Sequence, residues 1–116
     1  MRLFSGQRAF VAQRLSALVL LAYVAGGAVR LAFGMPVSFE RWQAWSAQPL
    51  GAPVLLLLAG ALIVHAWVGL RDVVLDYVHP LGLRLAVLGS AATGLAGLAA
   101  WTLFVVVRHA LSHTAL

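Results

Sequence analysis

Residues 50–70 read LGAPVLLLLAGALIVHAWVGL, and this stretch decides the fold class. It is long enough to cross a bilayer as a helix, which takes about 20 predominantly apolar residues. Its only ionisable side chain is His65. We therefore predict a transmembrane helix that carries one imidazole at depth.

The composition extends this prediction to the whole chain. Of 116 residues, 63% are hydrophobic and 9% are charged, which is typical of a polytopic helical membrane protein and excludes a soluble domain. The length leaves room for three spans and little else. We predict an all-α membrane protein with three transmembrane helices, part of a heteromeric helical bundle, because three helices alone cannot enclose a sizeable ligand.

Charge and cysteine usage exclude several classes of function. The net charge of +5 comes from arginines at the ends of the apolar stretches rather than along one face, so membrane lipid is an expected partner and nucleic acid is not. The chain has no cysteine, so it forms no disulfide and ligates no iron–sulfur cluster. Any redox centre held here must use histidine or methionine.

The chain reads as one membrane-anchor domain, residues 1–116. Pro53 suits the first turn of the second span, and Pro80 ends that span because the residue before a proline avoids the α region. Arg84 and Arg108 bound the third span. We predict spans at about residues 15–33, 53–78 and 85–107.

The first span has two interpretations. Its basic start followed by an apolar run resembles a signal peptide. However, the apolar run extends for 19 residues if Arg30 reaches the interface, which is long for the core of a signal. We expect a retained membrane span.

The connection at residues 34–52 is the longest polar segment. Phe39, Trp42 and Trp45 recur there at helical spacing. We predict a short amphipathic helix at the membrane interface, where tryptophan is enriched. An aromatic ligand box is the functional alternative.

The arginines also predict the orientation of the chain, because cytoplasmic segments carry an excess of them. The amino terminus and the second loop together hold five, whereas the opposite side holds three. We expect the amino terminus in the cytoplasm. The five are Arg2, Arg8, Arg14, Arg71 and Arg84, and the three are Arg30, Arg41 and Arg108.

His65 is the strongest candidate for a functional residue. It lies 12 residues after Pro53, a rise of about 18 Å, so it is close to mid-membrane. Gly69, Asp72 and Asp76 follow on the same helix stripe, and Gly69 leaves a gap where a flat macrocycle could approach. A structural histidine, an axial ligand of haem b and a proton relay all remain open from the residues alone.

Three further sets of polar residues have a functional and a structural interpretation. Asp76 and Tyr77 are either an interfacial anchor pair or a hydrogen-bonding site for a lipid-soluble carbonyl. Arg14 either reflects topology or pairs with a buried carboxylate such as a haem propionate. His109 and His113 have the i, i+4 spacing of metal ligands, but no carboxylate or cysteine is near, so we expect a solvated tail.

The segment His65-Ala-Trp-x-Gly69, followed after six residues by Asp76-Tyr77-Val-x-Pro80, closely resembles the second-helix motif of the hydrophobic membrane anchor subunits of succinate dehydrogenase. The three spans, the length and an arginine at the start of the first span fit the same family. The adjacent pair Arg71-Asp72 departs from it, since many members carry apolar or amide residues there.

The resemblance implies a role for each matching residue. His65 would be one axial ligand of the iron of haem b, with Gly69 on the cofactor's face and the second histidine supplied by a larger cytochrome b anchor subunit. Arg14 would neighbour a haem propionate. Tyr77 would hydrogen-bond ubiquinone, and Asp76 would shape that pocket.

The implied function is that of a membrane anchor of succinate:ubiquinone oxidoreductase, respiratory complex II, in a bacterial inner membrane. Such a subunit docks an iron–sulfur subunit and a flavoprotein subunit, belongs to the electron transport chain and is not catalytic alone. Two alternatives remain: a haem-binding anchor of another quinone oxidoreductase, and a small proton-coupled transporter that uses His65 and Asp76.

Overall fold

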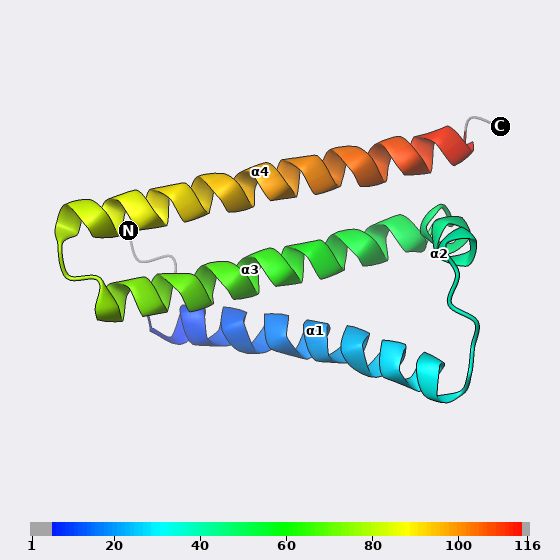
Figure 1. Cartoon of the computed structure of the whole chain (residues 1–116), viewed down its shortest axis with the longest axis horizontal. Helices are drawn as coiled ribbons and strands as arrows, with labels where there is room; N and C mark the ends of the chain where they lie inside the picture. Colours follow the sequence, from blue (N-terminus) through cyan, green and yellow to red (C-terminus); the bar gives the residue numbers. More distant parts are fainter. Residues whose placement is uncertain (1–5, 115–116) are drawn as a thin grey trace.

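The computed structural model describes residues 6–114 and is helical throughout its regular structure (Figure 1). Three of the helices are long and apolar enough to cross a membrane, as the sequence predicted. The chain is therefore a multi-pass membrane protein. The helices are α1 (Gln7–Ala32), α2 (Phe39–Ser46), α3 (Gly51–Tyr77) and α4 (Leu81–Thr114).

Helix α3 occupies the middle of the molecule, with α1 and α4 packed on its two sides (Figure 1). Both outer helices run antiparallel to α3, so the start of α1 and the turn between α3 and α4 lie at the same end. The short helix α2 lies at the other end (Figure 1). The result is a flat assembly of 52 × 33 × 21 Å.

The helices extend beyond the predicted spans. Helix α1 begins at Gln7 rather than near residue 15, and α4 continues to Thr114 rather than stopping near 107. Charged residues mark where the apolar layer ends, but they are good helix formers and do not stop the backbone. A helix of 34 residues is about 51 Å long, well beyond a hydrocarbon core of about 30 Å.

The loop between the first two spans contains the predicted amphipathic helix. Gly34 ends α1 with a φ of 65°, and the next amide, that of Met35, donates to the carbonyl of Arg30 at 3.1 Å. Ser38 then starts α2, because its side chain accepts from the amide of Arg41 at 3.2 Å. The rings of Phe39 and Trp42 are 6.2 Å apart.

Two contacts fix the ends of α3. At its start, a Cβ on Gly51 would overlap the carbonyl oxygen of Trp45 and lie 2.8 Å from the Cα of Ser46, so only glycine permits this turn. At its end, Arg84 donates to the carbonyls of Val78 at 3.0 Å and of Leu75 at 3.4 Å. These bonds satisfy carbonyls that have no partner within the helix.

The expectation of a solvated tail is wrong for His109. It belongs to α4, is half-buried and has its Nε2 3.1 Å from the hydroxyl of Ser46 and 3.3 Å from the carbonyl of Gln43. A carbonyl only accepts, so Nε2 carries the proton and donates. His109 thereby holds the end of α4 against α2. The ring of His113 packs edge-on against the ring of His109, with the ring centres 4.6 Å apart.

The three long helices bury little of their surface. Val68, only 1% exposed, and Val74, 4% exposed, are the best-covered side chains of α3, whereas α4 has no buried residue. Ser90 and Gly94, the small pair of α4, are exposed, and a Cβ at Gly94 would meet nothing within 4 Å. Lipid or further helices must cover this lateral surface.

Candidate functional site

His65 points from the middle of α3 toward α1. Its Nδ1 lies 3.3 Å from the hydroxyl oxygen of Ser16, a residue of α1 that is 6% exposed. The imidazole itself is half-buried. The contact joins two helices inside an otherwise apolar layer, as expected for a polar ring at this depth.

The bonds of Ser16 determine which nitrogen of His65 carries the proton. The Ser16 hydroxyl donates its single proton to the backbone carbonyl of Gln13 at 2.9 Å. It can therefore only accept from His65, so Nδ1 is protonated and Nε2 keeps its lone pair. Within residues 6–114, no hydrogen bond occupies Nε2. This imidazole is prepared to act as a ligand or an acceptor through Nε2.

A largely apolar cavity with three polar side chains in its lining adjoins this contact. It lies between the first half of α1 and the second half of α3 and has a volume of about 420 Å³. The side-chain carbonyl oxygen of Gln13 is buried beside it without a hydrogen-bond partner among the described residues. A buried amide oxygen without a partner is costly, so the site suits a polar group supplied from outside the described chain. Val68, Arg71 and Asp72 also line the cavity.

Gly69 faces the same part of α1. A Cβ added there would lie 3.8 Å from the Nε2 of Gln13, which is ordinary van der Waals contact. The packing of α1 on α3 therefore does not require glycine at this position. The reason for the glycine must lie in another helix, a cofactor or the history of the sequence.

The structure does not bring Arg14 against His65. Arg14 is exposed, and its guanidinium lies 4.9 Å from the centre of the Phe10 ring. It precedes Ser16 by two residues, which is about 200° around the helix, so it projects from the other side of α1. A cation over an aromatic face is weakly favourable, and the guanidinium remains accessible to an anionic group.

Asp76 and Tyr77 lie at the end of α3, about 16 Å of helix rise beyond His65. Both are exposed, and Tyr77 is 78% exposed. Arg84 holds the backbone that follows them. A site built on these two residues would therefore need a second wall from another molecule.

The divergent pair Arg71-Asp72 forms an ion pair at 3.5 Å. The Asp72 side chain is 58% exposed, so the pair contributes little to stability. Its place in the lining of the cavity beside Gln13, rather than its strength, is what distinguishes it. Among the described residues, no three His, Asp or Glu side chains gather in the way a metal site requires.

Sequence reasoning identified the imidazole but missed its partner Ser16 and the neighbouring Gln13, whose backbone carbonyl accepts from Ser16. A signal was present, because these two polar residues stand three apart at the start of an apolar span and so share a face. The sequence marked Arg84 as a bound of the third span and as a topology signal, whereas in the structure it also binds the last carbonyls of α3.

Comparisons with known proteins point to one family. The family described as succinate dehydrogenase/fumarate reductase transmembrane subunit matches residues 2–108. The chain is also similar to the succinate dehydrogenase hydrophobic membrane anchor subunit of Coxiella burnetii (strain RSA 493 / Nine Mile phase I). The two are 28% identical over 98 residues, which cover 84% of this chain and 85% of that protein. The family match covers α1 and α3 and reaches residue 108 of α4, and the protein belongs to the succinate dehydrogenase/fumarate reductase transmembrane subunit family.

Proposed function

We propose that this chain is the small membrane anchor of a succinate:ubiquinone oxidoreductase, and that it supplies one axial ligand of haem b and part of the ubiquinone-reducing site. The observation that carries the proposal is the orientation of His65. Its Nδ1–H is held by Ser16 in the middle of a membrane helix, which leaves Nε2 for a metal ligand bond. Family membership favours this function over a proton-coupled transporter.

The residues present fit half of a haem site. Neutral imidazole is a strong axial ligand of haem iron, and ligating histidines almost always donate their other ring N–H to a neighbouring acceptor. Ser16 provides that acceptor and Gly69 leaves room on the same face. Arg14 projects from the other side of α1, so its pairing with a propionate would need the side chain to turn toward the cofactor. A bound haem b supplies one-electron oxidation and reduction. The second axial ligand would come from the larger cytochrome b anchor subunit.

Tyr77 and Asp76 would form one wall of the quinone site. The phenol of Tyr77 can donate one hydrogen bond to a quinone carbonyl and so position the ring and stabilise the negative charge that reduction places on oxygen. Asp76 is one residue away and can hold or deliver a proton as the quinone takes up electrons. The high exposure of both side chains supports a site completed by partner subunits.

The same end of the molecule would dock the iron–sulfur subunit and, through it, the flavoprotein subunit. Four of the five arginines that suggest a cytoplasmic side lie at this end: Arg8, Arg14, Arg71 and Arg84. Arg2 lies outside the described residues. With this orientation, in a bacterial inner membrane, electrons from a cytoplasmic subunit reach the quinone without crossing the bilayer. The open small-residue face of α4 offers a packing surface for the larger anchor subunit.

The experiment that tests the quinone assignment replaces Tyr77 by phenylalanine in the purified complex. The ring and its packing remain, but the donor is lost, so succinate-to-quinone turnover should fall by up to about tenfold, the upper end of what one hydrogen bond contributes. Succinate oxidation with a soluble artificial acceptor and the haem spectrum should stay normal. The matched control is Tyr23→Phe. It removes a phenol hydroxyl that donates to the Val54 carbonyl, near the start of α3 and so toward the end of the molecule opposite Tyr77.

The result is decisive in both directions. A fall in quinone turnover with Tyr77→Phe but not with Tyr23→Phe supports the site. Unchanged quinone kinetics in an intact complex would make Tyr77 an interfacial anchor only, and the quinone assignment would be withdrawn.

A further inference from the structure

A second set of hollows lies at the end of the molecule opposite Asp76 and Tyr77. There α1 diverges from α3, and α2 lies beside the start of α3 (Figure 1). One hollow of about 310 Å³ faces α2, and another of about 670 Å³ runs along α1 and α3. Both are lined by Gly27, Arg30, Trp42 and Trp45, so they form one continuous groove, which we call the α1–α2 groove.

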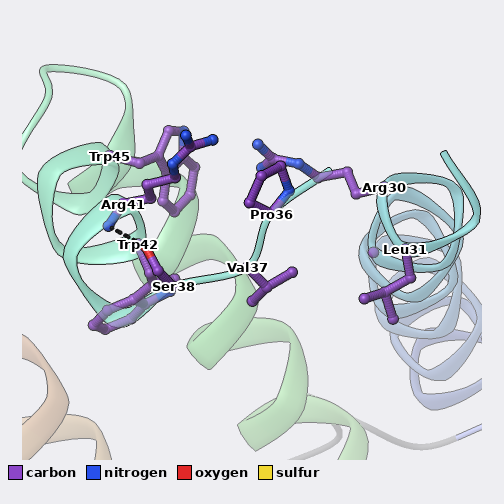
Figure 2. Close-up of a pocket in the computed structure, with 9 residues that line it drawn as sticks. Arg30, Leu31, Pro36, Val37, Ser38, Arg41, Trp42 and Trp45 are labelled. Atoms are coloured by element: carbon purple, nitrogen blue, oxygen red, sulfur yellow. Dashed lines mark hydrogen bonds between the residues drawn. The ribbon is translucent and has the colours of Figure 1, made fainter. Parts of the chain in front are cut away.

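Two guanidinium groups meet at the mouth of the α1–α2 groove. Figure 2 shows Arg30 of α1 and Arg41 of α2 directed into the same gap, next to Pro36. Across residues 6–114, neither arginine has a carboxylate within ion-pair distance. Two cations held near each other without an anion attract an anionic group, and planar guanidinium matches phosphate oxygens with paired hydrogen bonds.

The rest of the groove is apolar. Gly26, Gly27 and Leu58 line its deeper part, and a Cβ added to either glycine would meet nothing within 4 Å. The glycine pair therefore opens space that no described side chain fills. This half of the groove suits a hydrocarbon chain that lies along α1 and α3.

The tryptophans place the mouth of the groove at a definite depth. Trp42 and Trp45 line it from α2, and tryptophan rings prefer the headgroup level of a bilayer. Arg30 stands in the last turn of α1, where a membrane helix leaves the hydrocarbon. A phospholipid has a charged headgroup above an apolar chain, so it matches a groove with cations at headgroup depth and an apolar channel below them.

We propose that the α1–α2 groove binds one anionic phospholipid, with its phosphate between Arg30 and Arg41 and an acyl chain against Gly26 and Gly27. A quinone fits less well because it carries no charge to satisfy two guanidiniums. A haem bound at His65 would not fill the groove either. His65 lies 11 residues after Val54, which lines the groove, and this is about 16 Å of helix rise. The proposal does not depend on the haem or quinone assignments.

The test measures lipids bound to the purified protein, together with the subunits that accompany it. The protein is incubated with equal amounts of phosphatidylglycerol and phosphatidylethanolamine, and the lipids it retains are counted by native mass spectrometry. Each arginine near an anionic headgroup strengthens binding by about fivefold, so the doubly substituted Arg30→Gln, Arg41→Gln protein should bind phosphatidylglycerol about 25-fold more weakly. Arg108→Gln is the matched control, because Arg108 lies at the same end but lines a different hollow.

A second variant tests the apolar half. Gly27→Leu places a side chain in the groove, its Cβ meets no described atom within 4 Å, both arginines remain, and the lipid should again be displaced. Retention of phosphatidylglycerol equal to the wild type in either variant would overturn the proposal. Equal retention of the two phospholipids would overturn it as well, and so would a photo-cross-linker at Leu58 that captures a polypeptide or a quinone instead of lipid.

Discussion

Ser16→Ala should weaken haem binding without touching the proposed ligand. The substitution removes the acceptor of the His65 Nδ1–H and leaves the imidazole, its helix and its Nε2 in place. Ser16 is buried where α1 packs on α3, and alanine is smaller than serine, so the substitution creates no clash. The change therefore separates the orientation of His65 from its presence.

The expected size follows from the geometry. A donor–acceptor distance of 3.3 Å is at the long limit of such bonds, so its net contribution is about 0.5 kcal/mol, the low end of the usual range. Every ~1.4 kcal/mol is tenfold in affinity, so haem affinity should fall about twofold, less than the loss of about 10- to 100-fold that is typical when a metal-bound histidine loses its partner. A less basic imidazole stabilises ferric iron less, so the midpoint potential should rise by about 20 mV.

The assay is a redox titration of the purified complex followed by its haem absorbance, together with the ratio of haem to protein. Ser90→Ala is the matched control, since the Ser90 hydroxyl is exposed and donates only to the Ala86 carbonyl of its own helix at 2.8 Å. The Ser16 variant should have less haem and a higher potential than the Ser90 variant. Identical haem content and potential in the two would refute the reasoning that Ser16 orients the ligand.

Three further substitutions probe the packing around the site. Gly69→Ala should leave the chain folded because its nearest α1 atom is 3.8 Å away, yet weaken haem binding by about 1–3 kcal/mol; an unchanged haem-to-protein ratio would contradict this. His109→Ala removes the hydrogen bond to Ser46, worth about 0.5–1.5 kcal/mol, so the amides of α2 should exchange faster than in the His113→Ala control; equal exchange in the two variants would contradict the contact between α4 and α2. Gly51→Ala should destabilise the α2–α3 turn by about 1–3 kcal/mol in thermal unfolding, and a melting temperature no lower than that of Gly60→Ala, a change into open space, would disprove it.

The sequence predicted the parts of the fold that depend on hydrophobic length and local spacing. The three membrane helices follow from apolar runs, and α2 follows from the helical spacing of Phe39, Trp42 and Trp45. The depth of His65 needed only the distance from Pro53. These features depend on residues that are neighbours along the chain, so they can be predicted from a single sequence.

Contacts between helices were not predictable in the same way. The pairing of Ser16 with His65 spans 49 residues and depends on how α1 rotates about its axis against α3. The role of His109 spans 63 residues and depends on the length of α4, which brings its last turns beside α2. Apolar runs give no register between helices, because any rotation buries a similar amount of hydrocarbon.

The quinone and haem assignments rest on the motif and on family membership, and the structure adds the orientation of His65 to them. Asp76 and Tyr77 stand exposed at one end of α3, so the proposed quinone site would need partner subunits to complete it. The central claim about this chain is therefore the role of His65.

The most direct measurement is a reduced-minus-oxidised absorbance spectrum of the complex purified with wild-type chain, His65→Ala or His79→Ala. His79 is the control because it is exposed in the turn between α3 and α4. The account predicts a b-type spectrum for the wild type and for His79→Ala, and a changed or absent one for His65→Ala. An unaltered spectrum and full haem content in an assembled His65→Ala complex would contradict it.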